Sequence, residues 1–191
     1  EAWIDRGDPD SLLAASIFFD FRGIAGDVSM AARLRTHVTA LAQANRRFLK
    51  QMSDNALRSS PPLAWSGGML EQLFAAQALD IDLKSSGTSA FVDGARLLAL
   101  AHGVAATGTS RRLAALAEQG AVPADEARAW IDAFHFLQSL RLRVQQRPVG
   151  DRANPNLLDT RALSELDRRI LKEALRQARK LQQRLALDFP G

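Results

Sequence analysis

Apolar residues recur every three or four positions along most of the chain, which is the spacing of amphipathic α-helices. This spacing predicts helices over residues 27–52, 89–102, 109–119, 123–146 and 160–187. Glycines follow two of these segments, at Gly103 and Gly120, and glycine often ends a helix because it adopts a left-handed backbone at little cost. The sequence therefore predicts a mainly α fold, a bundle of four to six helices with short connections.

Two short segments follow a different period. Residues 17–22 and 79–84 alternate apolar with charged side chains, which is typical of β-strands. Because strands this short are unstable alone, we expect the two to pair as a small two-stranded β element near the N-terminus. Alternate residues of a strand point to the same side, so the pairing would gather charged side chains on one face. These side chains are Asp20, Arg22, Asp82 and Lys84.

The change of period divides the chain into two parts. Residues 1–26 hold the first strand and, before it, a short helix that Asp8 would cap and Pro9 would begin. Residues 27–191 are mainly helical, apart from the second strand and a loop over residues 53–68 that is rich in Ser, Pro and Gly. Apolar residues stay dense around this loop, so we expect it to lie within one domain.

The composition, 47% hydrophobic and 24% charged residues, is ordinary for a globular protein. Twenty-five Lys and Arg against 21 Asp and Glu give a net charge of +4, which solubility explains as well as a nucleic-acid partner does. The chain has no Cys and its three His lack metal-ligand spacing, so we expect no metal site within this chain alone. Neither a membrane-spanning run nor a signal peptide is recognisable, so we expect a cytoplasmic location.

The charged positions allow a structural and a functional interpretation. Asp93 and Arg96 lie three residues apart on a predicted helix and therefore share one of its faces. This pair and the charged strand face could form weak ion pairs in solvent or bind a ligand, and the pattern alone does not separate the two. On the last helix, acidic residues alternate with the basic ones and no aromatic residues accompany them, which favours a solvated face over nucleic-acid binding.

Six segments of the chain, taken together and in order, indicate a family resemblance more specifically than any one of them does alone. In order, they are residues 17–22, 26–27, 79–84, 91–100, 109–113 and 156–159. Together they resemble the substrate-binding domain of bacterial nucleotidyltransferases, which commonly follows cyclic-nucleotide-binding and CBS modules. Lys84, Gly87 and Asp93 stand where PII uridylyltransferase and glutamine synthetase adenylyltransferase have a Lys, a Gly-containing turn and an Asp-bearing helix start. The chain is thus similar to these two enzymes more remotely.

The resemblance implies that nucleotidyl transfer takes place in a catalytic head. There, a Gly-Ser turn and an Asp-x-Asp pair bind the nucleoside triphosphate (NTP) and two Mg²⁺ ions, and a neighbouring strand adds a third carboxylate. No Gly-Ser turn with an Asp-x-Asp pair precedes Asp20, and Asp80 and Asp82 have the spacing without the turn. We therefore expect the C-terminal part of a larger enzyme, inactive alone and without its own cofactor. Asp20 is the candidate for the third carboxylate, or else forms a structural ion pair with Arg22 or Lys84.

The same resemblance implies a substrate-binding surface that faces the head. Its expected residues are Arg22, Asp82, Lys84, Asp93 and Arg96. The expected partners are the head, the upstream regulatory modules and an acceptor, either a protein side chain or a small molecule. The alternative is a non-catalytic regulatory or dimerisation module, in which the bundle transmits a signal or pairs with a second copy. A basic nucleic-acid-binding domain is a third, less favoured interpretation.

Overall fold

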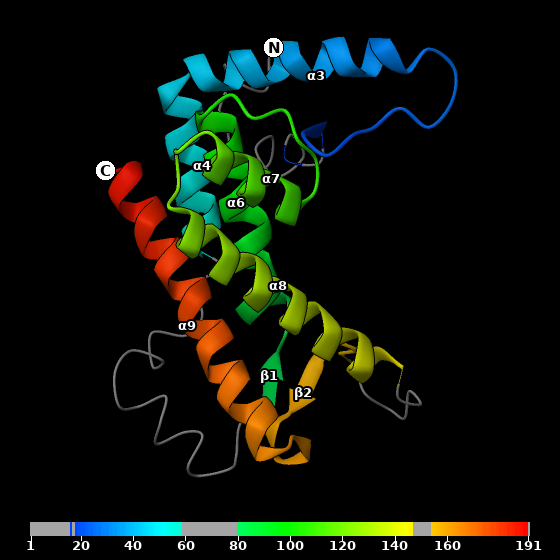
Figure 1. Ribbon diagram of the computed structural model, residues 1–191, viewed down its shortest axis with the longest axis vertical. Coiled ribbons are helices and arrows are strands. Elements are labelled where there is room, and N and C mark those ends of the chain that lie inside the picture. Colours follow the sequence, from blue (N-terminus) through cyan, green and yellow to red (C-terminus); the bar gives the residue numbers. More distant parts are fainter. Residues whose placement is uncertain (1–15, 17, 59–79, 147–153, 191) are drawn as a thin grey trace.

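The computed structural model describes residues 16, 18–58, 80–146 and 154–190 (Figure 1). In this part of the chain, the α-helices are α3 (Val28–Ala44), α4 (Arg46–Arg58), α6 (Ser89–Ala101), α7 (Thr109–Glu118), α8 (Ala124–Gln145) and α9 (Glu165–Asp188). Two strands, β1 (Asp80–Asp82) and β2 (Leu157–Asp159), form one antiparallel sheet. The mainly α fold with a small two-stranded element is confirmed. The division into residues 1–26 and 27–191 stays a prediction.

Helix α6 lies at the centre of the bundle and contacts α3, α4, α7 and α9. Its sequence is apolar on nearly every side from Ala95 onward, and Leu97 and Leu98 are fully buried. A helix that is hydrophobic all round is expected in an interior. Gly94 allows α9 to approach closely, because a Cβ at this position would lie 2.8 Å from Cδ2 of Leu181.

Helices α8 and α9 run antiparallel and pack along their length. Near the end of α8, Arg143 Nη1 lies 3.7 Å from Asp167 Oδ2 in the first turn of α9. At the other end, Arg184 Nη2 donates a hydrogen bond of 3.3 Å to the carbonyl of Ala121, just before α8. In Figure 1 the two helices diverge downward, and the small sheet lies between their lower parts. No helix in the described residues has the length and apolar character of a membrane span.

Residues 27–52 were predicted as one helix but form parts of two. The chain breaks at Asn45, whose backbone is extended (φ −105°, ψ 90°). The Asn45 Oδ1 atom accepts a hydrogen bond of 2.9 Å from the backbone N–H of Phe48, so it caps the start of α4. Helix α4 then continues to Arg58, which corrects the loop predicted from residue 53; the rest of that loop lies outside the described residues. In Figure 1, α3 extends across the top of the bundle.

The first predicted strand is wrong, and so is its pairing with residues 79–84. Phe19 and Asp20 form a turn, and residues 21–24 are irregular. Strand β1 pairs instead with β2, with Ile81 opposite Leu158, so the sheet is not near the N-terminus. Residue 17 and the helix predicted at Asp8 lie outside the described residues.

Two backbone carbonyls of this N-terminal segment accept hydrogen bonds from side chains and not from a partner strand. Arg112 Nη2 donates to the carbonyl of Phe19 (2.8 Å), and Arg35 Nη2 donates to the carbonyl of Phe21 (2.6 Å). The Phe19 ring is buried and packs on Phe48, with 5.8 Å between ring centroids. The alternation of apolar and charged residues therefore does not mark a strand here. Its apolar residue Phe19 is buried in a turn and anchors the segment.

A short π-helix, η2 (Lys84–Thr88), joins β1 to α6. Its hydrogen bonds span five residues, from Thr88 N–H to the Leu83 carbonyl and from Ser89 N–H to the Lys84 carbonyl. Gly87 faces α8, where a Cβ would lie 3.1 Å from Cδ1 of Leu137. The turn is thus wider than an α-helical one and packs closely on its neighbour.

Candidate functional site

Asp20 lies at the centre of a group of charged side chains from three segments. Asp20 Oδ2 is 2.6 Å from Arg96 Nη2, and Asp20 Oδ1 is 2.7 Å from Arg112 Nη2. The other Arg96 terminal nitrogen, Nη1, is 2.8 Å from Asp93 Oδ1. The Asp20 and Asp93 side chains are 39% and 34% exposed, whereas those of Arg96 and Arg112 are 8% and 4% exposed. We call these four residues the Asp20 cluster: two carboxylates at the surface with two buried guanidinium groups behind them.

Each member of the Asp20 cluster has a local structural reason for its position. Asp93 and Arg96 are neighbours on α6 because residues three apart share a helix face. Arg112 lies on the buried stripe of α7, where its Nε also donates to the carbonyl of Ala106 (3.0 Å). Asp20 follows the anchored ring of Phe19 and is thereby directed at both arginines.

The two carboxyl groups of the cluster differ in pKa. Burial acts to raise the pKa of Asp20, but the hydrogen bond and charge of Arg96, followed by those of Arg112, lower it below its ordinary value. Burial raises the pKa of Asp93 above its ordinary value; Arg96 offsets this only in part, and the charge of Asp20 adds to it. Of the two carboxyl groups, that of Asp20 therefore loses its proton more readily, and that of Asp93 retains its proton more readily.

Asp82 belongs to a different group of polar residues. Its Oδ1 accepts hydrogen bonds from the backbone N–H groups of Lys84 (2.8 Å) and Ser85 (3.0 Å), and its Oδ2 accepts one from Asn154 Nδ2 (2.7 Å). Burial would raise the pKa of Asp82, but these bonds, led by that of Asn154, lower it. Asn156 extends the group, since its Oδ1 accepts from Arg141 Nε (2.6 Å). Asp82 thus fixes the start of η2 beside β2.

The structure therefore brings together only part of the predicted site. Asp20, Asp93 and Arg96 are in direct contact, whereas Asp82 lies in the other group. Arg22 and Lys84 are exposed, and their side chains make no hydrogen bond or ion pair with another described residue. The predicted approach of Asp20 and Arg22 to Asp82 or Lys84 is wrong, because arginines bind Asp20 and an asparagine binds Asp82.

Two functional candidates were missed from the sequence. Arg112 occupies a buried helix position next to Leu113, and a charged residue on the apolar face of a predicted helix is the signal that marks it. Asn154 lies in an irregular segment before a strand of three residues, where the sequence has no periodic signal.

The described residues do not fit a Mg²⁺ site. Both carboxylate oxygens of Asp20 are bound to guanidinium groups, and those of Asp82 accept hydrogen bonds from the backbone of η2 and from Asn154. No group of three His, Cys, Asp or Glu in the described part of the chain could hold a metal ion. Binding of Mg²⁺ and NTP by the parent enzyme stays a prediction.

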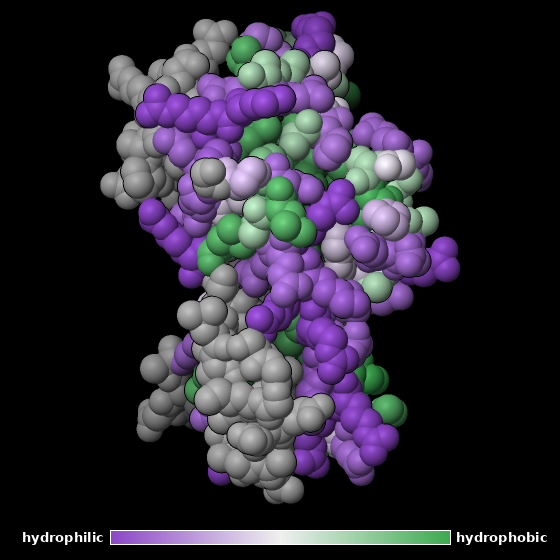
Figure 2. Space-filling model, turned by 90° about the vertical axis from the view of Figure 1, so that its left-hand side faces the viewer, coloured by the Kyte–Doolittle hydropathy of each residue, from purple (hydrophilic) through white to green (hydrophobic). Residues whose placement is uncertain are grey.

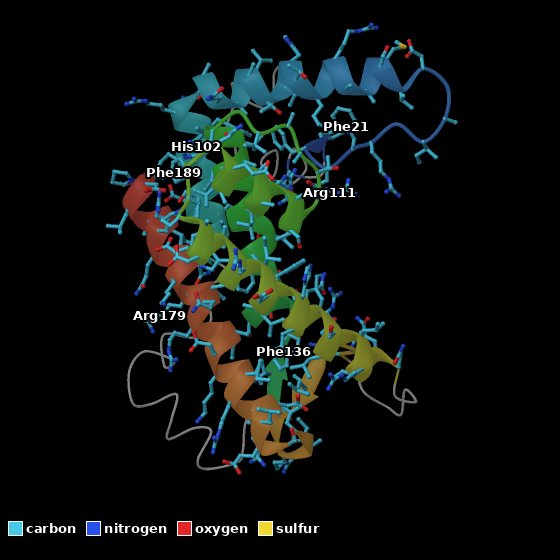
Figure 3. All side chains as sticks on the ribbon, viewed as in Figure 1. Phe21, His102, Arg111, Phe136, Arg179 and Phe189 are labelled. Carbon is cyan, nitrogen blue, oxygen red and sulfur yellow. The ribbon has the colours of Figure 1, made fainter. Side chains whose placement is uncertain are left out.

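Three basic residues of α9 form ion pairs with acidic neighbours along the helix. Arg169 pairs with Glu165, Arg176 with Glu173, and Arg184 with Asp188. The face shown in Figure 2 is largely hydrophilic, and in Figure 3 Arg179 extends away from the bundle. These pairs favour the interpretation of a solvated helix face.

A comparison with protein families gives a match over most of the chain. Residues 46–189 match the family model described as "Putative nucleotidyltransferase substrate binding domain". Asp93, Arg96 and Arg112 lie within the matched region, and Asp20 precedes it. Neither the curated proteins nor the solved structures that were searched gave a match. Because the family model covers well over half of the chain, the chain belongs to this family of nucleotidyltransferase substrate-binding domains.

Proposed function

We propose that this chain docks beside a nucleotidyltransferase head and positions the acceptor of the nucleotidyl group, with the Asp20 cluster facing the head. The cluster is the observation on which the proposal rests. It presents two partly exposed carboxylates at one place on the surface, and two buried arginines hold them there.

Stability alone does not explain this arrangement. Removing charged groups from water is costly, and well-packed hydrophobic residues often replace a buried ion pair without loss of stability. Arg96 and Arg112 are nevertheless buried, and each is directed at a carboxylate that stays in contact with solvent. Such positioning of a reactive group by buried neighbours is what a binding site requires.

The residues of the proposed surface have distinct roles. Asp93, with its raised pKa, accepts a hydrogen bond or a proton from the hydroxyl group of the acceptor. Arg22 and Lys84 are exposed cations that contact phosphate groups at the junction with the head. The parent enzyme supplies NTP and Mg²⁺, and upstream modules of the cyclic-nucleotide-binding or CBS type regulate it in the cytoplasm. The acceptor is a protein side chain or a small molecule.

Transfer of a labelled nucleotide tests the proposal. The isolated chain should transfer none, whereas the full-length enzyme should transfer it to its acceptor in the presence of Mg²⁺. Asp93→Asn in the full-length enzyme should lower kcat at least tenfold, because the amide cannot accept a proton. Asp188→Asn is the matched control, since Asp188 also pairs with an arginine, at 2.7 Å, but lies at the end of α9.

Two results would contradict the proposal. The first is transfer by the isolated chain, and the second is full turnover by a correctly folded Asp93→Asn enzyme.

A second candidate function is dimerisation, and the exposed apolar residues on and before α3 favour it. Ile24, Val28, Met30 and Leu34 are 90%, 58%, 62% and 52% exposed, which is unusual for neighbouring large apolar side chains. Equilibrium sedimentation tests this candidate. A dimer that Leu34→Gln converts to a monomer supports it, and a wild-type chain that stays monomeric at high concentration excludes it.

A further inference from the structure

Three guanidinium groups from three helices converge on residues 19–21. Arg112 of α7 binds both Asp20 Oδ1 (2.7 Å) and the Phe19 carbonyl (2.8 Å), and Arg96 of α6 binds Asp20 Oδ2 (2.6 Å). Arg35 of α3 binds the Phe21 carbonyl at 2.6 Å, and its guanidinium carbon lies 5.4 Å from the centre of the Phe21 ring. One carboxylate and two backbone carbonyls thus serve as acceptors for three cations. Figure 3 shows Phe21 at the same side of the molecule as Arg111, at the start of α7.

These arginines are close enough to repel one another. Burial lowers the pKa of Arg112, the charge of Asp20 opposes this, and the charges of Arg96 and Arg35 lower it further. Like charges held together in a poorly hydrated region need an anion between them. Counting Asp93, the region holds three guanidinium groups and two carboxyl groups.

The same region has hydrogen-bond donors to spare. The Nε atoms of Arg96 and Arg35 are buried and have no acceptor among the described residues. A carboxylate has two acceptor oxygens, whereas a phosphate group has at least three and can hold close to two negative charges near neutral pH. Forked guanidinium groups bind phosphate through paired hydrogen bonds. A phosphate group would therefore match these donors and charges better than the single carboxylate of Asp20 does.

We propose that Arg96 and Arg112, with Arg35 beside them, form a binding site for a phosphate group, in which the Asp20 carboxylate stands in for that group. Asp20 is the most exposed member of the arrangement, so it covers the two arginines from the solvent side and can turn away. The inference deepens the proposed function: the phosphate belongs either to the nucleotide or to a phosphorylated acceptor.

The test removes the stand-in carboxylate. In the 191-residue chain, Asp20→Ala should bind inorganic phosphate about tenfold more tightly than the wild type does, measured by isothermal titration calorimetry at fixed ionic strength. Asp188→Ala is the matched control, because it changes the net charge equally and also removes an aspartate bound to an arginine. It should bind phosphate no better than the wild type.

Two double variants show which arginines are responsible. Asp20→Ala with Arg112→Lys should lose most of the gained affinity, because lysine keeps the charge but not the fork. Asp20→Ala with Arg169→Met should keep it, because Arg169 is exposed and lies on α9, outside the site. Titration with an NTP and with O-phosphoserine then distinguishes the two sources of the phosphate, since the true source should bind more tightly than inorganic phosphate.

Folding of the variant is part of the test. If Asp20→Ala is unfolded in phosphate-free buffer, added phosphate should refold it, seen as recovered helical circular dichroism at 222 nm. The proposal is overturned if the variant stays unfolded in phosphate, or if it folds and binds phosphate no better than Asp188→Ala. That outcome would leave the proposed function standing, because these measurements use the chain without a head and involve no transfer.

Discussion

Replacing Asp20 by Asn tests the energetics of the Asp20 cluster directly. Asn keeps the size of the side chain but removes the negative charge that binds Arg96 Nη2 at 2.6 Å and Arg112 Nη2 at 2.7 Å. Breaking a buried ion pair on one side costs about 3–5 kcal/mol. Here the cost is smaller, since Asp20 is 39% exposed, Arg96 keeps Asp93, and Arg112 keeps two carbonyl acceptors.

We expect Asp20→Asn to lower the free energy of unfolding by about 2 kcal/mol at pH 7. For a chain of this size, that corresponds to a fall in Tm of about 4–8 °C. Thermal unfolding followed by circular dichroism at 222 nm, in buffer free of phosphate, measures it. A change below about 0.5 kcal/mol, the usual range for surface substitutions, would refute the reasoning, because the ion pairs would then contribute nothing measurable.

The effect should also depend on pH. Arg96 and Arg112 overcome the effect of burial and hold the pKa of Asp20 below its ordinary value of 3.8. The folded state therefore favours the ionised carboxylate, and its stabilisation is complete above the unfolded pKa and is lost as the pH falls through the folded pKa. The difference in Tm between the wild type and Asp20→Asn should stay constant near neutral pH and shrink as the pH falls below 3.8.

Asp93→Asn should behave in the opposite way. Burial raises the pKa of Asp93, so the ionised form is disfavoured in the folded state relative to the unfolded one. At pH 7 this variant should therefore be as stable as the wild type or slightly more stable. An Asp93→Asn variant less stable than Asp20→Asn would show that the two carboxylates have been assigned the wrong roles.

Three further predictions concern single positions. Lys84→Met should barely change the Tm of this chain, since the side chain is exposed, yet it should strongly reduce turnover in the full-length enzyme. If the variant instead loses its fold and the surviving full-length enzyme keeps its specific activity, the role of Lys84 is structural. Asn45→Ala should cost about 1 kcal/mol in chemical denaturation, because it removes the cap on the Phe48 N–H, and an unchanged midpoint would exclude that cap. Gly94→Ala should lower the free energy of unfolding by about 1–3 kcal/mol in the same assay, because its Cβ would lie 2.8 Å from Cδ2 of the buried Leu181. An unchanged free energy of unfolding would mean that α9 moves aside easily.

The sequence predicted helices such as α8 and α9 well because each of them buries one apolar stripe, and that stripe is visible in the spacing of its residues. The sequence failed to predict local structure at places where the contacts of a single residue determine the backbone conformation. Asn45 was visible as a polar interruption of the stripe, but its side chain caps the next helix, and this contact has no periodic signal. Residues 17–22 were predicted as a strand because apolar and charged side chains alternate there, but the Phe19 ring is buried in a turn.

For the candidate site, local relations were predictable and distant ones were not. Asp93 and Arg96 were recognised as a pair because three residues separate them on one helix. Asp20 and Arg112 are about half of the chain length apart in the sequence, and no spacing rule connects a turn near the N-terminus with a helix that begins at Thr109. Asp82 was identified as a charged residue of a predicted strand, but its partner Asn154 lies in a distant irregular segment.

The π-helix η2 has a consequence for insertions and deletions. Its five-residue hydrogen bonds accommodate one residue more than an α-helical turn would. Deleting Ser86 would restore α-helical spacing, and it would rotate everything before the deletion by about 100° and shift it by about 1.5 Å relative to α6. Lys84 would then point in a new direction relative to Asp93, and β1 would no longer meet β2 in register. The direction of the exposed lysine is thus set by the number of residues in one turn, and a length change that alters no charged group should misdirect it.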